Sequence, residues 1–260
     1  MKKHLLLILT ALSLYAGSTL CPSHYLEGIV PDIQNQKLSS KAREVCYDDY
    51  GVMHSGITKT PLWSAEFLTA NSNKIKRKDA FHTEDKLPFG ERSELSDYVR
   101  SGYDRGHMTP SADATSEKGQ YETFSLANIV PQDSYLNQNL WSSIESATRY
   151  LASKDKGIFV ITGPLFIGKS LKAIGHNKVL VPTHVYKIVY SPKQHKGAVF
   201  VCNNASVNTY SVITIAELEK ISGINFFPKL GNQQKSDLLD LPKVLKRGSK
   251  EEYQKTGLGI

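Results

Sequence analysis

The chain has 260 residues, of which 40% are hydrophobic and 22% are charged. That apolar content is sufficient for a folded core and excludes a wholly disordered protein. Lysine and arginine number 32 against 25 acidic residues, and the net charge of +7 favours a polyanionic partner, either nucleic acid or an anionic membrane. Three cysteines are too few for a disulfide scaffold or a four-cysteine zinc site.

The first 18 residues have the pattern of a secretory leader. Lysines at positions 2 and 3 precede about 12 mostly apolar residues, which suits a signal-peptide core and is shorter than a membrane span. We therefore expect residues 1–18 to be a signal peptide and the mature protein to be exported, periplasmic or secreted, without stable membrane association. An uncleaved anchor is the alternative. A lipid anchor at Cys21 is disfavoured because Leu20, which is not small, precedes it.

Export changes the interpretation of the cysteines. Cys21 and Cys46 are candidates for a disulfide that closes a loop of about 25 residues and contributes roughly 3 kcal/mol by the chain-entropy estimate. Cys202 follows an apolar run and is expected to be buried in a strand. Because sequence does not determine connectivity, three reduced and buried thiols are the alternative.

Periodicity and turn residues predict one domain over residues 19–250 and a charged tail at 251–260. The chain beyond Ser249 is expected to be frayed. Glycine and proline at 163–164 are expected to end the strand before them. The expected elements, in chain order, are a strand at 61–70, a polar loop at 74–88, a turn-rich stretch at 91–107, a helix at 116–125, a long helix at 134–153, strands at 157–162, 179–190 and 197–202, and a helix at 214–222.

The long helix is the clearest element, with Asp133 or Ser134 as its N-cap. Apolar residues recur along it at the 3.6-residue period, at Leu136, Leu140, Ile144, Ala147 and Leu151. A second line of residues, spaced by four, consists of Asn137, Trp141 and Glu145. An amide and a carboxylate two turns apart should therefore point the same way, beside the buried face.

One segment, Asp104-Arg105-Gly106-His107, combines groups suited to phosphate chemistry. Arg105 can fork onto phosphate oxygens, and His107 can accept a proton near neutral pH. Gly106 permits a turn or a close approach to a ligand, and Asp104 could orient either neighbour. By itself the segment is equally compatible with a solvated, charged turn.

Further segments extend this pattern, and with them the chain resembles the DNA/RNA non-specific endonucleases, the ββα-metal nucleases that include secreted bacterial nucleases and mitochondrial endonuclease G. The resemblance covers most of residues 45–230. The spacing from His107 to Asn137 and on to Glu145 makes it specific. Besides the four-residue motif it rests on Thr109-Pro110, Ala112-Asp113, Thr123-Phe124, 128–132 (Asn-Ile-Val-Pro-Gln), Asn137, Trp141, Glu145, 161–164 (Ile-Thr-Gly-Pro), 181–184 (Val-Pro-Thr-His) and 226–228 (Phe-Phe-Pro).

The resemblance implies an α+β fold of the ββα-metal (His-Me finger) type, a mostly antiparallel sheet flanked by helices. The active site would lie between a loop at 104–107 and the helix of Asn137. His107 would be the general base, and Asn137 would be the one protein ligand of a magnesium ion. Magnesium retains several waters, so a single amide ligand suffices when the scissile phosphate is another; manganese is the alternative ion.

The resemblance also implies supporting roles for other residues. Arg105 and Glu145 would position or stabilise the site, and Asp104 and Asn128 would support it without binding the ion. An upstream arginine would bind phosphate; the first candidate is Arg77, and its competitors are Arg92 and Arg100.

A competing pattern lies at residues 163–170, Gly-Pro-Leu-Phe-Ile-Gly-Lys-Ser, which matches a phosphate-binding loop after a strand. Taken literally, it predicts a nucleotide triphosphatase. The bulky interior of this segment and the Gly175-His176-Asn177 break soon after it oppose that interpretation.

The sequence thus predicts an exported, magnesium-dependent endonuclease that cuts DNA and RNA with little sequence specificity, because no residue obviously reads a base edge. The alternatives are a family member that binds nucleic acid without cutting it and, less favoured, the triphosphatase. The sequence does not fix the oligomeric state and is compatible with a homodimer.

Overall fold

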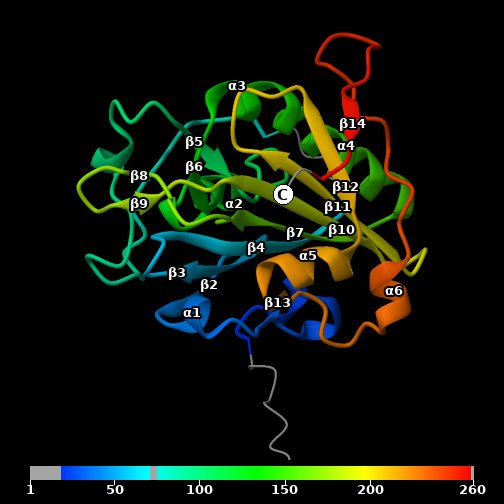
Figure 1. Cartoon of the computed structure of the whole chain (residues 1–260), viewed down its shortest axis with the longest axis horizontal. Helices are drawn as coiled ribbons and strands as arrows, with labels where there is room; N and C mark the ends of the chain where they lie inside the picture. The colour runs from blue at the N-terminus through cyan, green and yellow to red at the C-terminus, as the bar shows by residue number, and fades with distance from the viewer. Residues whose placement is uncertain (1–18, 71–74, 259–260) are drawn as a thin grey trace, which may run out of the picture.

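The structure, a computed structural model, describes residues 19–70 and 75–258 (Figure 1). The predicted signal peptide lies outside these ranges. The centre is an eight-stranded sheet in the order β14-β12-β11-β10-β7-β4-β3-β2. Neighbouring strands are antiparallel except β12 and β14. Its strands are β2 (Ala42–Cys46), β3 (Gly51–Ser55), β4 (Thr60–Leu68), β7 (Ile158–Leu165), β10 (His184–Ser191), β11 (Lys196–Asn203), β12 (Thr209–Ile213) and β14 (Gln254–Thr256).

The remaining elements are small sheets and helices around the large sheet. Three two-stranded sheets pair β1 (Asp32–Ile33) with β13 (Ile224–Asn225), β5 (Asp104–His107) with β6 (Ile129–Gln132), and β8 (Ala173–Ile174) with β9 (Val179–Leu180). The α-helices are α1 (Gln36–Ser39), α2 (Glu117–Thr123), α3 (Ser134–Leu136), α4 (Ser142–Asp155), α5 (Ile215–Ser222) and α6 (Asn232–Ser236). Short 3₁₀ turns are η1 (Pro22–His24), η2 (Leu26–Gly28), η3 (Leu95–Tyr98) and η4 (Leu126–Asn128), and η5 (Asn137–Trp141) is a π-helical turn.

The centre of the large sheet is buried on both faces, because β7, β10 and β11 are buried at nearly every position. On β10, Val185 and Val189 belong to one core, whereas Tyr186 and Ile188 belong to the core on the opposite face. Figure 1 shows α1, α5 and α6 on one side of the sheet, and α3, α4 and the β5–β6 hairpin on the other. No helix among the described residues is both long enough and apolar enough to span a membrane.

The β5–β6 hairpin leads directly into the long helix, which gives the ββα arrangement. Asp104 pairs with Gln132 and His107 with Ile129. The motif is therefore a strand, and the predicted loop at 104–107 was wrong. Its backbone is held by the antiparallel ladder to β6.

The predicted helix at 134–153 is present, but it contains a π-helical turn. α3 leads into η5 at Asn137, and α4 continues to Asp155. Asp133 is the N-cap, accepting from the Leu136 amide at 3.0 Å. A π turn widens a helix by one residue and is frequent at functional sites, and here it carries Asn137.

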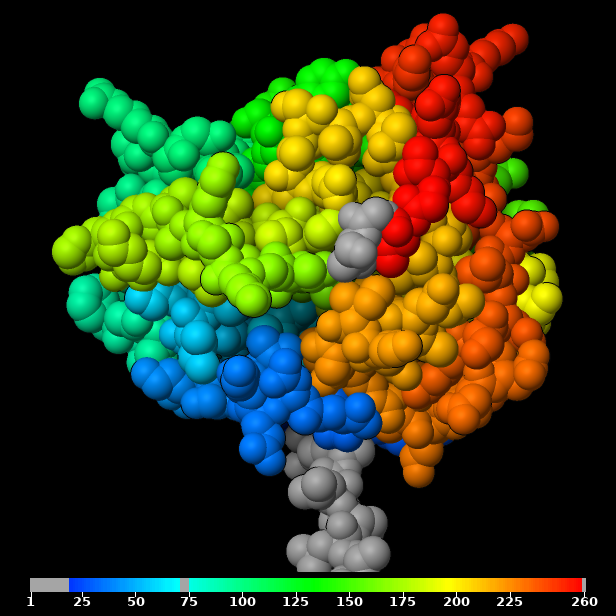
Figure 2. Space-filling view, viewed as in Figure 1, coloured from blue at the N-terminus to red at the C-terminus, as the bar shows by residue number. Residues whose placement is uncertain are grey.

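Three other expectations differ from the structure. The predicted strand at 179–190 is two strands, because the stretch around Pro182 lacks pairing; proline cannot donate to a ladder. β7 continues through Gly163 and Pro164 to Leu165 instead of ending there. The tail is not frayed throughout, because β14 pairs in parallel with β12 and closes one edge of the large sheet. Figure 2 shows these C-terminal residues, in red, lying along the surface.

Trp141 and Tyr150 provide a stability test on one helical stretch. Trp141 is 1% exposed, so we expect Trp141→Ala to lower the free energy of unfolding by about 3–5 kcal/mol. Tyr150 is 63% exposed, so Tyr150→Ala should change it by no more than about 0.5 kcal/mol. Urea denaturation measures both, and equal losses would contradict the assignment of Trp141 to the core.

Candidate active site

The motif, the helix and the upstream arginine meet at one pocket of about 430 Å³. β5 contributes Asp104, Arg105 and His107. The pocket is polar, with both cationic and anionic walls. Its other lining residues are Arg77, Pro110, Ser111, Ala112, Asn137, Gln138, Ser142, Glu145 and Arg247.

Asp104 connects the strand to the π-helical turn. Its carboxylate accepts hydrogen bonds from Asn137 Nδ2 at 2.9 Å, Gln138 Nε2 at 2.9 Å and Ser134 Oγ at 2.7 Å. Burial acts to raise the pKa of Asp104, but these hydrogen bonds outweigh it and hold the pKa below its usual value. Because Asn137 donates its NH₂ to Asp104, its carbonyl oxygen is left for another partner in the pocket.

His107 is a neutral imidazole enclosed by aromatic rings. The centroids of Phe81 and Phe124 lie 5.3 Å and 4.9 Å from that of His107. Burial, assisted by the positive charge of Arg77, lowers the pKa of His107 to about 3. Its Nε2 is buried and has no hydrogen-bond partner in the described part of the chain. A proton acceptor is therefore present at neutral pH.

Two neighbours fix the backbone around His107. A Cβ on Gly106 would collide with the Gln132 side chain of the paired strand, so this position requires glycine. Asn128 is fully buried; its Oδ1 accepts from the Thr109 amide at 2.9 Å, and its Nδ2 donates to the carbonyls of Thr109 and Thr123. Both polar atoms of the Asn128 side chain form hydrogen bonds to backbone groups, so Asn128 supports the chain after His107.

Arg77 and Arg105 line the pocket over the same aromatic rings. The Arg105 guanidinium carbon lies 4.5 Å from the Phe81 centroid, and that of Arg77 lies 5.2 Å from the Phe124 centroid. Arg77 also pairs with Asp79 at 2.6 Å.

The two competing arginines lie elsewhere. Arg92 is occupied by Asp85 and Glu94, both at 3.0 Å, and by backbone carbonyls. Arg100 does not line the pocket.

Glu145 enters the pocket from α4, two turns after Asn137. Burial raises the pKa of Glu145 to about 7, although Lys187 and Arg149 oppose the shift. Below the pocket, Arg149 pairs with buried Asp113 at 2.9 Å. Buried Lys187 donates to Thr162 Oγ1 at 2.6 Å.

The structure confirms the predicted disulfide between Cys21 and Cys46. It joins the N-terminal segment to β2, the edge strand opposite β14. Cys202 is free and buried in β11, as expected.

The segment at 163–170 does not have the structure of a phosphate-binding loop. Gly163 to Leu165 belong to β7, and a Cβ at Gly163 would meet the Tyr186 hydroxyl and the Leu62 carbonyl. The chain then continues into β8, where the phosphate-loop pattern requires a helix.

Comparison with known proteins agrees with this geometry. The profile of the DNA/RNA non-specific endonuclease family matches residues 30–233. The chain belongs to this family. It is 33% identical over 222 residues to the mitochondrial nuclease EXOG of Danio rerio, covering 76% of this chain and 65% of that one. It is 32% identical to nuclease C1 of Cunninghamella echinulata, covering 74% and 85%.

Structural comparison supports the same fold class. The crystal structure of an EndoG/EndoGI complex matches with a TM-score of 0.65 and 29% identity, covering 74% of this chain and 88% of that chain. The predicted α+β, ββα-metal fold is thereby confirmed. The family is metal-dependent, and the pocket of this chain contains oxygen donors. The side-chain carbonyl of Asn137 has no hydrogen-bond partner among the described residues, and the Glu145 carboxylate lines the same pocket. This donor set fits a hard divalent cation.

Several residues in or next to this pocket were missed in the sequence. Gln138 and Ser134 hold Asp104, and neither belongs to a recognisable motif. Arg149 could have been found, because it continues the four-residue spacing of Asn137 and Glu145. Arg247 could not, since it lies more than 100 residues after Glu145, with which it lines the pocket.

The depressed pKa of His107 predicts a pH-dependent stability. Between pH 6.5 and about 3 the unfolded imidazole binds a proton that the buried one does not, so this group lowers the free energy of unfolding as pH falls, by up to about 1.4 kcal/mol per pH unit. In His107→Gln, the urea midpoint should therefore fall less steeply over this range. His54→Gln, which removes a histidine with a pKa of about 4, should likewise make the urea midpoint fall less steeply as the pH falls. Parallel profiles for wild type and His107→Gln would contradict the neutral, buried assignment.

Proposed function

We propose that this chain is an exported, Mg²⁺-dependent endonuclease that hydrolyses phosphodiester bonds in DNA and RNA with little sequence specificity. The observation that carries the proposal is a neutral histidine facing a pocket that also presents three arginines and a pair of oxygen donors.

His107 would remove the proton from the attacking water. Because its pKa is lowered to about 3, the imidazole is in the basic form throughout the neutral range. The flanking rings of Phe81 and Phe124 restrict its orientation.

Arg77 and Arg105 would bind non-bridging phosphate oxygens. Their guanidinium groups are positioned by the same two aromatic rings, so they approach the phosphate from the side of His107. Contacts of this kind recognise the backbone and not a base edge, which supports sequence-tolerant cleavage.

Asn137 Oδ1 would hold the divalent ion, and Glu145 would hold a water of its hydration shell. When bound, magnesium, or manganese as the alternative, supplies positive charge that stabilises the phosphorane and the leaving oxygen. Asp104 orients the amide so that its oxygen faces the pocket.

The Cys21–Cys46 disulfide supports export, because disulfides persist in oxidising compartments. Identification of the mature N-terminus by mass spectrometry of periplasmic and secreted fractions tests both the cleavage after residue 18 and the absence of stable membrane association. Light scattering of the purified protein distinguishes a monomer from a homodimer.

The central test is plasmid degradation with and without EDTA. Wild type should degrade DNA and RNA only when the metal is available, and His107→Ala should lower the rate about 10²–10⁴-fold while retaining substrate binding. Lys169→Ala, in the segment that mimics a phosphate loop, is the control and should retain the wild-type rate. If His107→Ala retains more than a tenth of the rate, His107 is not the base; if wild type binds DNA without cutting, the protein is a binding member of the family.

Asn137→Ala tests the metal site on a helix that should stay folded. Asp104 keeps its hydrogen bonds from Ser134 and Gln138, so the melting temperature should be nearly unchanged. Activity at ordinary magnesium should be lost, and Glu145→Gln should have the milder effect, about 10–100-fold, expected of a group that acts through a bound water. Nuclease assays over a magnesium titration measure this. Full activity of Asn137→Ala at ordinary magnesium would place the ion elsewhere.

A further inference from the structure

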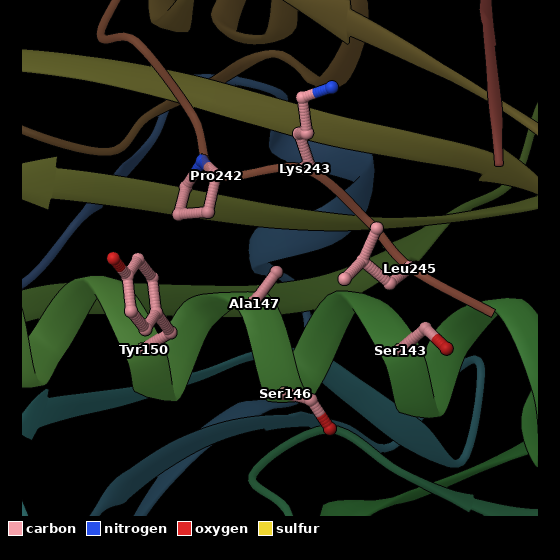
Figure 3. A pocket seen from close by; sticks show the side chains of 7 residues that line it. All are labelled: Ser143, Ser146, Ala147, Tyr150, Pro242, Lys243 and Leu245. Carbon is pink, nitrogen blue, oxygen red and sulfur yellow. The ribbon is translucent and has the colours of Figure 1, made fainter. Parts of the chain in front are cut away.

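A second pocket, of about 470 Å³, lies on α4 beside the catalytic pocket (Figure 3). Ala147 and Tyr150 face it from the helix, and Pro242 and Leu245 cover it from a C-terminal segment that crosses above. In Figure 3 the Tyr150 ring and Pro242 lie toward one end, and Leu245 lies above Ser143 toward the other. Tyr150 and Leu245 are 63% and 43% exposed, so the pocket has apolar walls and is open to solvent.

The covering segment lies beyond residues 30–233, the part matched by the family. It is nevertheless anchored, because Val244 and Tyr253 belong to the same core as α4. Backbone hydrogen bonds from Tyr253 to Val244 and from Lys246 to Glu251, both 2.8 Å, form a hairpin that turns at Gly248, whose φ is +71°. This C-terminal hairpin is therefore an ordered wall of the pocket.

The C-terminal hairpin reaches both pockets. Leu245 lines the apolar pocket, and Arg247 lines the catalytic pocket together with Glu145. Lys243 and Lys246 are paired with Glu252 and Glu251 at 3.2 Å and 2.7 Å. Arg247, in contrast, forms no ion pair with any acidic residue within 19–70 and 75–258. Its guanidinium is available to a phosphate.

We propose that the apolar pocket is a nucleobase subsite: it binds an unstacked base of the substrate strand while Arg247 binds a phosphate between that base and the scissile bond. The proposal rests on the proposed nuclease function. Tyr150 offers an exposed ring on which a base can stack, and Pro242, Ala147 and Leu245 supply the apolar walls. Stacking on an aromatic side chain binds any base, which agrees with sequence-tolerant cleavage.

The separation of the two pockets fits a short stretch of nucleic acid. From Glu145 to Tyr150 the helix rises about 7.5 Å. Phosphates along one strand of a duplex have an axial spacing of roughly 3.4 Å, and those of an unstacked strand lie further apart, so this rise corresponds to at most about two nucleotides. A base in this pocket cannot remain paired in a duplex, so the preferred substrate is a single-stranded or locally opened segment.

The test compares two polymers that differ only in their bases: oligo(dT) and an oligonucleotide of equal length built from abasic tetrahydrofuran units. Wild type should cleave oligo(dT) with a kcat/KM at least about tenfold higher, a typical effect of stacking one base. Tyr150→Ala should reduce this ratio about tenfold, mostly through KM, and Tyr150→Phe should preserve it. Phe89→Ala removes an aromatic side chain that is 82% exposed and is not part of either pocket, and is the matched control.

The salt dependence of cleavage tests the role of Arg247 separately. Loss of one phosphate contact should reduce the slope of log(kcat/KM) against log[salt] on oligo(dT) by about 0.7 in Arg247→Ala. Lys169→Ala removes a positive charge outside the pocket and should retain the wild-type slope.

Different results distinguish a failure of the proposed nuclease function from a failure of the nucleobase subsite. Failure of wild type to cleave plasmid or either polymer would refute the nuclease function and the subsite with it, whereas cleavage of plasmid but of neither polymer would refute the subsite alone. Cleavage with the same oligo(dT)-to-abasic ratio in wild type and Tyr150→Ala would refute the subsite alone. Dissociation of a dimer by Tyr150→Ala, measured by light scattering, would also refute it, because the pocket would then be an interface between two copies of the chain.

Discussion

Three hydrogen bonds to the Asp104 carboxylate join the two halves of the active site. Asp104 begins the strand that carries Arg105 and His107, and its partners lie on the first turns of the long helix. His107 and the Asn137 amide therefore belong to segments whose relative position is fixed by one side chain. The carboxylate stays ionised because these donors outweigh its burial, so the connection persists over the neutral pH range.

Beneath this connection lies a cluster of buried titratable groups. Glu66, Asp113 and Lys187 are at most 6% exposed, and Arg149 reaches Asp113 from α4. Burial raises the pKa of Glu66, whereas the nearby cations of Lys187 and Arg149 lower it. Removal of one member would leave an uncompensated charge in the core, so a single substitution in this cluster should lower the free energy of unfolding. The helix that carries Glu145 is thereby held by electrostatics as well as by its apolar stripe.

Much of this arrangement was predictable from local pattern. The apolar period of the long helix, the strands around 61–70 and 197–202, and the link from His107 to Asn137 depend on residues close in sequence or on a specific family spacing. The π-helical turn was not predictable from local pattern, because its residues Asn137 and Gln138 form hydrogen bonds to Asp104 on a different element, β5. Tertiary pairing likewise decided the rest: β7 continues through Gly163 and Pro164 because β10 pairs with both residues, although β4 pairs with β7 only as far as Thr162. β14 is ordered because β12 offers an edge.

The buried position of Cys202 has a consequence for biosynthesis. In an oxidising compartment, the three thiols can form the observed Cys21–Cys46 bond or one of two incorrect bonds, and both incorrect bonds require Cys202. In the folded protein this thiol is 1% exposed in β11, and burial raises its pKa, so its reactive thiolate form is suppressed. Scrambling is therefore confined to the interval before the central strands assemble. Once β11 is enclosed, Cys202 is no longer accessible to thiol–disulfide exchange. Packing of the sheet therefore protects the Cys21–Cys46 bond from rearrangement.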